Sequence, residues 1–284
     1  MRGLFRSHRK IPMPELPEVE TTRQSILSLI GKRFKKVTIR NGSLRWPVPN
    51  KLGQFVKKQV IDAIERRGKY LLLRMNSGTI LIHLGMSGCL RLGDQSTPLR
   101  KHDHVDFLFE DNTLLRYHDP RRFGSVLWTI DKPEDHPRLT NLGPEPLSRN
   151  FNADYFFKQA QDRSVPIKTF LMNSAIVVGV GNIYATESLF TAGIHPLQAA
   201  GEISLTQCQL LIKAVKTTLR RAIRQGGTTL KDFTSSDGKP GYFQQSLQVY
   251  GRSGSPCINC DSLLVKSVIA GRATVHCAEC QKAG

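Results

Sequence analysis

Short apolar runs alternating with turn residues dominate the first half of the chain. Segments rich in β-branched and aromatic residues follow one another between clusters of Gly, Asn, Asp and Pro: KKVTIR, QVIDAIERR, KYLLLRM, GTILIHL, HVDFLFE, TLLRYH and GSVLWTI. Runs of this length, bounded by turn residues, are typical of strands. Their close spacing predicts an antiparallel sandwich or barrel.

A helical pattern precedes the strands and returns after them. From Pro17 to Ile30 a proline and two acids open the segment, apolar residues recur on one side, and Gly31 follows. These are the signals of a helix start and stop. A Pro-rich passage, NLGPEPLSRN, ends the strand pattern, and helix-period segments follow at 153–161, 167–173, 182–192 and 205–224.

The patterns together predict a multidomain α+β protein. We expect a β-sandwich with flanking helices at 14–143, a linker at 144–150, a helical domain at 151–248 and a cysteine module at 249–284. The helical part contains a long polar loop, QGGTTLKDFTSSDGKPGYFQQS, and loops of this length usually have a function. Residues 1–12 are basic and are expected to be an extension outside the mature protein.

Charge adds a partner to this picture. The chain has 41 Lys and Arg against 23 Asp and Glu, a formal net charge of +18 spread from end to end. A distributed excess of this size favours a polyanion, and a folded surface that follows phosphates. No apolar run is long enough to span a membrane, so we expect no membrane partner.

The cysteines predict a metal site near the C-terminus. Cys257 and Cys260 form one C-x-x-C pair, and Cys277 and Cys280 form another. This spacing predicts a four-thiolate zinc site, which leaves no open coordination position and therefore has a structural role. Between the pairs, LLVKSVIAGRATVH predicts a β-hairpin whose turn projects Arg272. That arginine is either a phosphate contact or simply solvated.

A glycine-rich segment, VVGVGNIYATE, nearly matches the dinucleotide-binding fingerprint. The third small residue comes one place late, and no second strand follows to complete a βαβ unit. We therefore reject a nicotinamide oxidoreductase. We expect instead a tight turn between two helices, with Asn182 capping the second helix and free N–H groups available to a phosphate.

Two charged turns remain ambiguous on spacing alone. DPRRFG at 119–124 is either an ordinary charged turn or a place where arginines grip DNA while an aromatic ring wedges between bases. KHDH at 101–104 has no third metal ligand nearby in the sequence. We therefore do not expect a metal site there.

The segment MPELPEVE carries the sharpest chemical hypothesis. If translation begins at Met13, removal of that methionine leaves Pro14 with a free secondary amine. An α-amino group has a pKa of about 8 against about 10 for lysine, so it is a readier nucleophile toward a sugar C1′. Glu15 would supply a carboxyl group for proton transfer. If the chain begins at Met1, the same nitrogen is an amide and has no lone pair for attack.

Several motifs occur in a fixed order: PELPEVE, RGKYLLL, HLGMSG, KHDHVD, DPRRFG, VVGVGNIYA, QGGTTLKDF, SDGKPGYFQ and the cysteine pairs. In this combination the chain from Met13 to about Lys282 closely resembles bacterial formamidopyrimidine-DNA glycosylase. Enzymes of this family remove oxidised purines and then nick the strand. The resemblance implies a β-sandwich, a helix-two-turn-helix domain and a zinc finger, with duplex DNA in the cleft between the halves.

The resemblance also implies catalytic roles. Pro14 would be the nucleophile at C1′, Glu15 the proton donor at the sugar, and Glu18 a supporting carboxylate. Lys69 would donate a proton during β-elimination. Arg272 would act in δ-elimination and in phosphate binding.

DNA contacts follow from the same resemblance. Met86, Arg121 and Phe123 would fill the gap left by the everted base, with Arg121 facing the orphaned cytosine, and the SSDGKPGYF loop would close over that base. The implied contacts to the DNA backbone are His102, Arg122, Arg163, Lys168 and Asn182.

Two other functions remain open on the sequence. One is an endonuclease VIII-like glycosylase for oxidised pyrimidines, and the other is a zinc-dependent DNA-binding protein without catalysis. For the favoured enzyme we expect a monomer with one structural zinc ion, acting on double-stranded DNA in the bacterial cytoplasm in association with the nucleoid.

Overall fold

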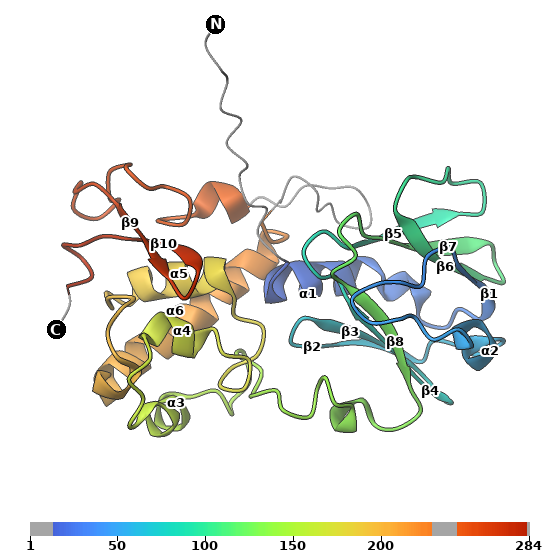
Figure 1. Cartoon of the computed structure of the whole chain (residues 1–284), viewed down its shortest axis with the longest axis horizontal. Coiled ribbons are helices and arrows are strands. Elements are labelled where there is room, and N and C mark those ends of the chain that lie inside the picture. The colour runs from blue at the N-terminus through green and yellow to red at the C-terminus, as the bar shows by residue number, and fades with distance from the viewer. Residues whose placement is uncertain (1–13, 229–242, 283–284) are drawn as a thin grey trace, which may run out of the picture.

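The computed structural model describes residues 14–228 and 243–282. The expected extension at 1–12 lies outside these residues, as does the expected capping loop at 235–243 apart from Phe243. Figure 1 shows two halves side by side, a β-rich half from the first part of the chain and a helical half from the second. The predicted α+β architecture with antiparallel sheets is confirmed.

Two antiparallel sheets form the β-rich half. The first has the order β1 (Phe34–Ile39), β6 (Asp103–Phe109), β7 (Thr113–His118) and β5 (Cys89–Asp94). The second has the order β2 (Ala63–Arg67), β3 (Tyr70–Met75), β4 (Gly78–His83) and β8 (Ser125–Thr129). Strands of both sheets contribute to one shared hydrophobic core, so the two sheets pack as a sandwich.

The helix that precedes the first strand packs against the core of the sandwich. Leu71 and Leu73 on β3 point into the same core as Phe107 on β6 and are fully buried. The first helix, α1 (Leu16–Ser25), adds Val19 to this core. Packing of the sandwich therefore fixes Glu15, the residue directly before the helix.

The apolar pattern missed some elements and overextended others. The short helix α2 (Leu52–Val56), which packs on β1, is too brief to show a helical period. β5 escaped prediction because only Leu90 and Leu92 alternate in it, a pattern too short to mark a strand. The helix expected at 17–30 ends at Ser25, and a 3₁₀ turn follows at Leu27–Leu29. QVIDAIERR forms a strand only from Ala63 onward.

The helical half contains α3 (Ala153–Ala160), α4 (Ile167–Leu171), α5 (Asn182–Thr191) and α6 (Leu205–Arg224). The Asn152 side chain caps α3, and Ser204 with Gln207 forms a capping box at the start of α6. From Ile183 to Phe190, α5 is buried throughout, as expected for the central helix of a bundle. Within the described residues, no helix has both the length and the apolar character that a membrane span requires.

The C-terminal module is a hairpin of β9 (Val265–Ile269) and β10 (Arg272–His276). Ala270 and Gly271 at its turn both have positive φ, as a two-residue type I′ turn requires. Val275 and Leu264 share a small core with Phe190 of α5. The hairpin is therefore packed against the helical half (Figure 1).

A cluster of charges ties the two halves together where the chain crosses between them. The Glu145 carboxylate accepts hydrogen bonds from Arg66 at 2.8 Å, from Arg67 at 3.2 Å and from the Gly68 N–H at 2.6 Å. Arg67 also donates to the carbonyls of Leu142 and Gly143, both at 2.7 Å. The turn before Lys69 is thereby held to the segment that links the halves.

Candidate active site

Glu15 lies at the junction of the two halves. Its carboxylate accepts hydrogen bonds from the N–H groups of Gly181 at 2.8 Å, Ile183 at 2.9 Å and Tyr184 at 3.4 Å. These are the free donors at the N-terminus of α5, where a helix favours negative charge. The side chain is 3% exposed, so an acid from the first helix caps a helix of the other half.

This arrangement corrects the predicted role of Asn182. The N-cap position of α5 is Gly181, and Asn182 makes no capping hydrogen bond. Because Glu15 accepts from the N–H groups of Gly181, Ile183 and Tyr184, these three groups are not open to a phosphate. Gly181 is required at this point, since a Cβ there would lie 2.3 Å from the carboxyl carbon of Glu15.

Burial dominates the acidity of Glu15. It raises the pKa from 4.5 to about 7, while Lys69 opposes the rise, Glu18 adds to it, and the backbone N–H groups oppose it. Glu15 therefore exchanges its proton near neutral pH, as a general acid or base should. Pro14, the neighbouring residue, is buried as well.

Glu18 connects the start of α1 to the helical half. Its carboxylate accepts from the Glu15 N–H at 2.9 Å, the Tyr184 hydroxyl at 2.7 Å, and both the N–H and hydroxyl of Thr228 at 2.8 Å. With these donors the fully buried side chain is satisfied. Sequence reasoning identified Glu18 but missed Tyr184 and Thr228, which no local motif marks.

Lys69 follows the turn that is held by Glu145. Burial is the main cause that lowers the pKa of Lys69. The carboxylates of Glu15 and Glu18 act in the opposite direction, and the charge of Arg272 lowers the pKa further. The structure thus brings together Glu15, Glu18 and Lys69, and the charge of Arg272 acts on Lys69.

His83 is a neighbour of Lys69 that sequence reasoning missed. Burial, followed by the charges of Lys69 and Arg45, lowers its pKa to about 4, so the imidazole is neutral at physiological pH. Its Nδ1 accepts a hydrogen bond from the Gly85 N–H at 3.0 Å, which leaves Nε2 as the protonated nitrogen. The motif HLGMSG could have pointed to it, but only Met86 was taken from that motif.

Helices α4 and α5 of the helical half contact the β9–β10 hairpin beside Glu15 and Lys69. Lys168 on α4 is 1% exposed and donates to the Thr274 hydroxyl at 2.6 Å. Asn182 donates to the Ala273 carbonyl at 3.0 Å. Burial lowers the pKa of Lys168 to about 8, with Glu15 opposing and Arg272 contributing. A pocket of about 330 Å³ between α4 and the hairpin has Lys168 and Arg272 in its wall.

The predicted DNA wedge comes from two loops, which we call the wedge loops: 85–88, with Met86, and 120–124, with Arg121 and Phe123. Phe123 is 45% exposed, and the guanidinium of Arg121 lies 4.9 Å from the centre of its ring. An exposed aromatic residue paired with a cation is suited to stacking on bases. Arg122 is exposed beside them with positive φ.

His102 and Arg163, which are also predicted to contact the DNA backbone, lie outside the cluster of Glu15, Glu18 and Lys69. His102 is half-buried with positive φ, and its ring centre lies 6.2 Å from that of His118. Among the described residues, those of KHDH are not part of any cluster that could hold a metal ion. The Nε2 of His104 is hydrogen-bonded to the Asp119 carbonyl oxygen at 2.8 Å. Arg163 is exposed in the turn after α3.

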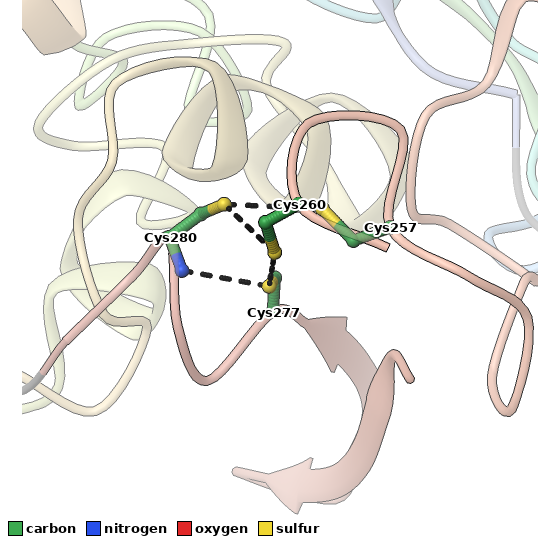
Figure 2. Close-up of side chains that lie close together, drawn as sticks. All are labelled: Cys257, Cys260, Cys277 and Cys280. Carbon is green, nitrogen blue, oxygen red and sulfur yellow. Dashed lines mark hydrogen bonds between the residues drawn. The ribbon is translucent and has the colours of Figure 1, made fainter. Parts of the chain in front are cut away.

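The four cysteines of the C-terminal module converge, as Figure 2 shows. Their sulfur atoms all lie within 4.8 Å of one another, with Cys260 3.5 Å from both Cys277 and Cys280, and Cys257 3.9 Å from Cys280. Zinc–sulfur bonds of about 2.3 Å in a tetrahedron place sulfurs about 3.8 Å apart. The four thiolates can therefore hold a metal ion of this size.

Comparison with known proteins agrees with this geometry. Residues 13–126 match the family model for the formamidopyrimidine-DNA glycosylase N-terminal domain, and residues 142–234 match that for the H2TH domain of the same enzymes. A formamidopyrimidine-DNA glycosylase of Psychromonas ingrahamii is 54% identical over 270 residues, which cover 95% of this chain and 100% of the relative.

Solved structures give the same result. The MutM (Fpg) protein from Thermus thermophilus is 36% identical with a TM-score of 0.85, covering 95% of this chain and 100% of that protein. Lactococcus lactis Fpg, in a complex with DNA containing an abasic site, is 32% identical with a TM-score of 0.87, covering 94% of this chain and 99% of that one. The resemblance seen in the motifs is confirmed: this chain belongs to the formamidopyrimidine-DNA glycosylase family of DNA-repair enzymes.

Proposed function

We propose that this protein removes oxidised purines, including 8-oxoguanine and formamidopyrimidines, from duplex DNA and then cleaves the strand by β,δ-elimination. Family membership supports the glycosylase activity. The observation that carries the mechanism is Glu15, a buried carboxyl group with a pKa of about 7 next to Lys69 and directly after Pro14.

The nucleophile is the Pro14 nitrogen, freed by translation from Met13 and removal of that methionine. The family model begins at residue 13, which supports this start. The amine attacks C1′ of the damaged nucleotide and loses its proton, while the bond from C1′ to the base breaks and the base leaves with a proton. The nitrogen lone pair then breaks the bond from C1′ to O4′, O4′ takes up a proton, and the sugar ring opens. The resulting iminium ion is positively charged and draws electrons from C2′, so it prepares the elimination.

Glu15 and Lys69 divide the proton transfers. Glu15, protonated in part near neutral pH, donates to the sugar as C1′ is attacked. Lys69, with its lowered pKa, is a better acid than an exposed lysine and donates during β-elimination. Arg272 holds the phosphate and assists the second elimination. Glu18 supports the site by orienting the Glu15 backbone.

Binding and base extrusion belong to the remaining residues. Taking a base out of the stack costs a few kcal/mol, which intercalating side chains and phosphate contacts offset. Met86, Arg121 and Phe123 fill the gap, with Arg121 facing the orphaned cytosine. The phosphate contacts are His102, Arg122, Arg163, Lys168 and Asn182.

The metal ion in the cysteine cluster is one structural zinc. Four thiolates fill its coordination shell, so it supplies shape to the hairpin that carries Arg272 and does no chemistry. We further propose that the enzyme is a monomer. We also propose that it acts in the bacterial cytoplasm on nucleoid DNA, because the relatives come from bacteria and the proposed substrate is chromosomal DNA.

A strand-nicking assay tests the substrate class. The protein beginning at Pro14 is incubated with duplexes carrying 8-oxoguanine, an oxidised pyrimidine or no lesion. Preferential cleavage at 8-oxoguanine opposite cytosine, leaving phosphates at both ends of the gap, is the expected result. Preference for the pyrimidine would favour an endonuclease VIII-like enzyme, and binding without any cleavage would favour a non-catalytic DNA-binding protein.

A further inference from the structure

The two wedge loops are braced against each other by one buried acid. Asp119 is fully buried, and its carboxylate accepts hydrogen bonds from the Ser87 hydroxyl at 2.7 Å, the Gly124 N–H at 2.9 Å and the Tyr117 hydroxyl at 3.1 Å. Ser87 belongs to the first wedge loop and Gly124 to the second. A single side chain thus joins both loops to the sandwich.

Ser87 makes the connection direct. Its hydroxyl donates to Asp119 and accepts a hydrogen bond from the Arg121 N–H at 3.2 Å. Because Ser87 directly follows Met86, this hydroxyl fixes the backbone of Arg121 relative to the loop that carries Met86. Two of the three proposed wedge residues are therefore linked through one side chain that is itself 3% exposed.

Glycines allow the two loops to touch along their backbones. A Cβ at Gly85 would lie 2.4 Å from the Gly124 nitrogen and 2.4 Å from the Phe123 carbonyl carbon. A Cβ at Gly124 would lie 1.9 Å from the Tyr117 hydroxyl. A side chain at Gly85 would therefore collide with the second wedge loop, and the two loops pack backbone against backbone there.

The brace depends on every donor. In the described part of the chain, the hydrogen-bond donors to the Asp119 carboxylate are two hydroxyls and one N–H, all of them neutral. A buried charge without a cation needs its hydrogen bonds, and the loss of one is costly. The backbone of Asp119 takes part too, since its N–H donates to the His102 carbonyl at 3.1 Å.

We propose that Asp119 and Ser87 are positioning residues that make the two wedge loops one rigid body. In this role they deliver Met86 and Arg121 to the DNA together, so that filling the gap and facing the orphaned base happen in one step. The proposal rests on the function proposed above. It assigns to this brace the discrimination between cytosine and adenine opposite the lesion.

The matched pair of variants is Ser87→Ala and Ser125→Ala. Ser125 directly follows the second wedge loop and is fully buried, but its hydroxyl has no hydrogen-bond partner in the described structure. Both substitutions remove one buried oxygen from the same region. They differ in whether that oxygen joins the loops, so Ser125→Ala measures the effect of losing a buried hydroxyl alone.

Single-turnover base excision is measured on duplexes with 8-oxoguanine opposite cytosine or adenine. Ser87→Ala should slow excision opposite cytosine about tenfold, and narrow the cytosine-to-adenine ratio by a similar factor, because Arg121 is no longer held. Ser125→Ala should keep the rate and ratio of the parent. A Ser87→Ala rate and ratio within about twofold of Ser125→Ala would overturn the proposal.

A second variant and a reference reaction make the result decisive. Asp119→Asn replaces one acceptor oxygen with a donor, so it should reproduce both effects at least as strongly; an unchanged ratio would also overturn the proposal. The reference is borohydride trapping on single-stranded abasic DNA, which has no orphaned base. The variants should trap like the parent. A parent that traps neither this strand nor an abasic duplex would instead refute the proposed function.

Discussion

Single residues in this protein owe their chemistry to where the fold buries them. Glu15 sits at the positive end of α5 and takes three backbone N–H bonds, an arrangement that by itself favours the ionised form. Burial outweighs these contacts and raises the pKa to about 7. The same helix end that positions the acid therefore does not keep it ionised.

Glu15→Gln gives the first prediction. General acid catalysis contributes about 10² to 10⁴ in rate, so base excision should fall by at least about a hundredfold. The parent should also lose activity on the alkaline side of about pH 7, as Glu15 loses its proton. A variant that keeps the parent rate and pH profile in single-turnover excision would remove Glu15 from the mechanism.

Stability gives Glu15 an independent test with a defined sign. Because the folded pKa is raised from 4.5 to about 7, the native state binds more protons than the unfolded one in this range. Native stability should therefore decrease as pH rises from about 4.5 to about 7, by up to about 3 kcal/mol from this group. Denaturant unfolding of the parent and of Glu15→Gln, measured across that pH range, tests this. The free energy of unfolding of the variant should decrease less with pH than that of the parent. The same pH dependence in both proteins would contradict the raised pKa of Glu15.

Among the elements, the hairpin depends most on its neighbours. Lys168 and Asn182 reach it from α4 and α5, and a small apolar core completes the contact. Nothing in the local sequence of the hairpin specifies this docking. It positions Arg272 so that its charge adds to the effect of burial, which lowers the pKa of Lys69.

Thr274→Val tests the docking, with Thr274→Ser as the control that keeps the hydroxyl. Valine leaves the buried Lys168 ammonium without its 2.6 Å acceptor, and such bonds to charged groups contribute about 1.5 to 3 kcal/mol. We expect the valine variant to unfold at lower denaturant and to bind abasic DNA more weakly than the serine variant. The difference should shrink above about pH 8, where Lys168 is neutral. Equal stability and affinity of the two variants would contradict this role.

The elements also show what sequence reasoning can reach. The strands on either side of DPRRFG and the helix at 205–224 were predictable, because apolar periodicity reports burial directly. Glu15, Glu18 and Lys69 were predicted from motifs, and the structure brings them together. His83, Tyr184 and Thr228 were missed because their partners are distant in sequence. Asn182 was assigned a cap that Glu15, from the other half, provides.

At the scale of the whole molecule, the candidate active site lies where the two halves meet. Glu15 comes from the first half, its hydrogen-bond donors come from the second, and Glu145 holds the turn before Lys69 to the crossing segment. The excess of basic residues then draws DNA to the surface, and only four of them, Arg2, Arg6, Arg9 and Lys10, lie in the expected extension. The hairpin with Arg272 completes the site from the far end of the chain.

Removal of the metal ion tests whether DNA binding depends on the hairpin that carries Arg272. The parent should contain one zinc per chain, and chelation should weaken DNA binding because the hairpin loses its four-cysteine anchor. Cys260→Ser should have the same effect, whereas Cys208→Ala should not, since Cys208 lies buried in the helical core. Metal analysis and DNA titration measure both. Unchanged affinity after complete metal loss would contradict a structural role.

The proposed mechanism depends above all on the attack of the Pro14 nitrogen on the damaged nucleotide. Its most direct test is borohydride trapping of the protein on duplex DNA with 8-oxoguanine opposite cytosine, followed by mass spectrometry of the crosslinked peptide. We expect a crosslink at the nitrogen of an N-terminal Pro14. If a protein shown to begin at Pro14 forms no crosslink, or forms it only at Lys69, then Pro14 is not the nucleophile.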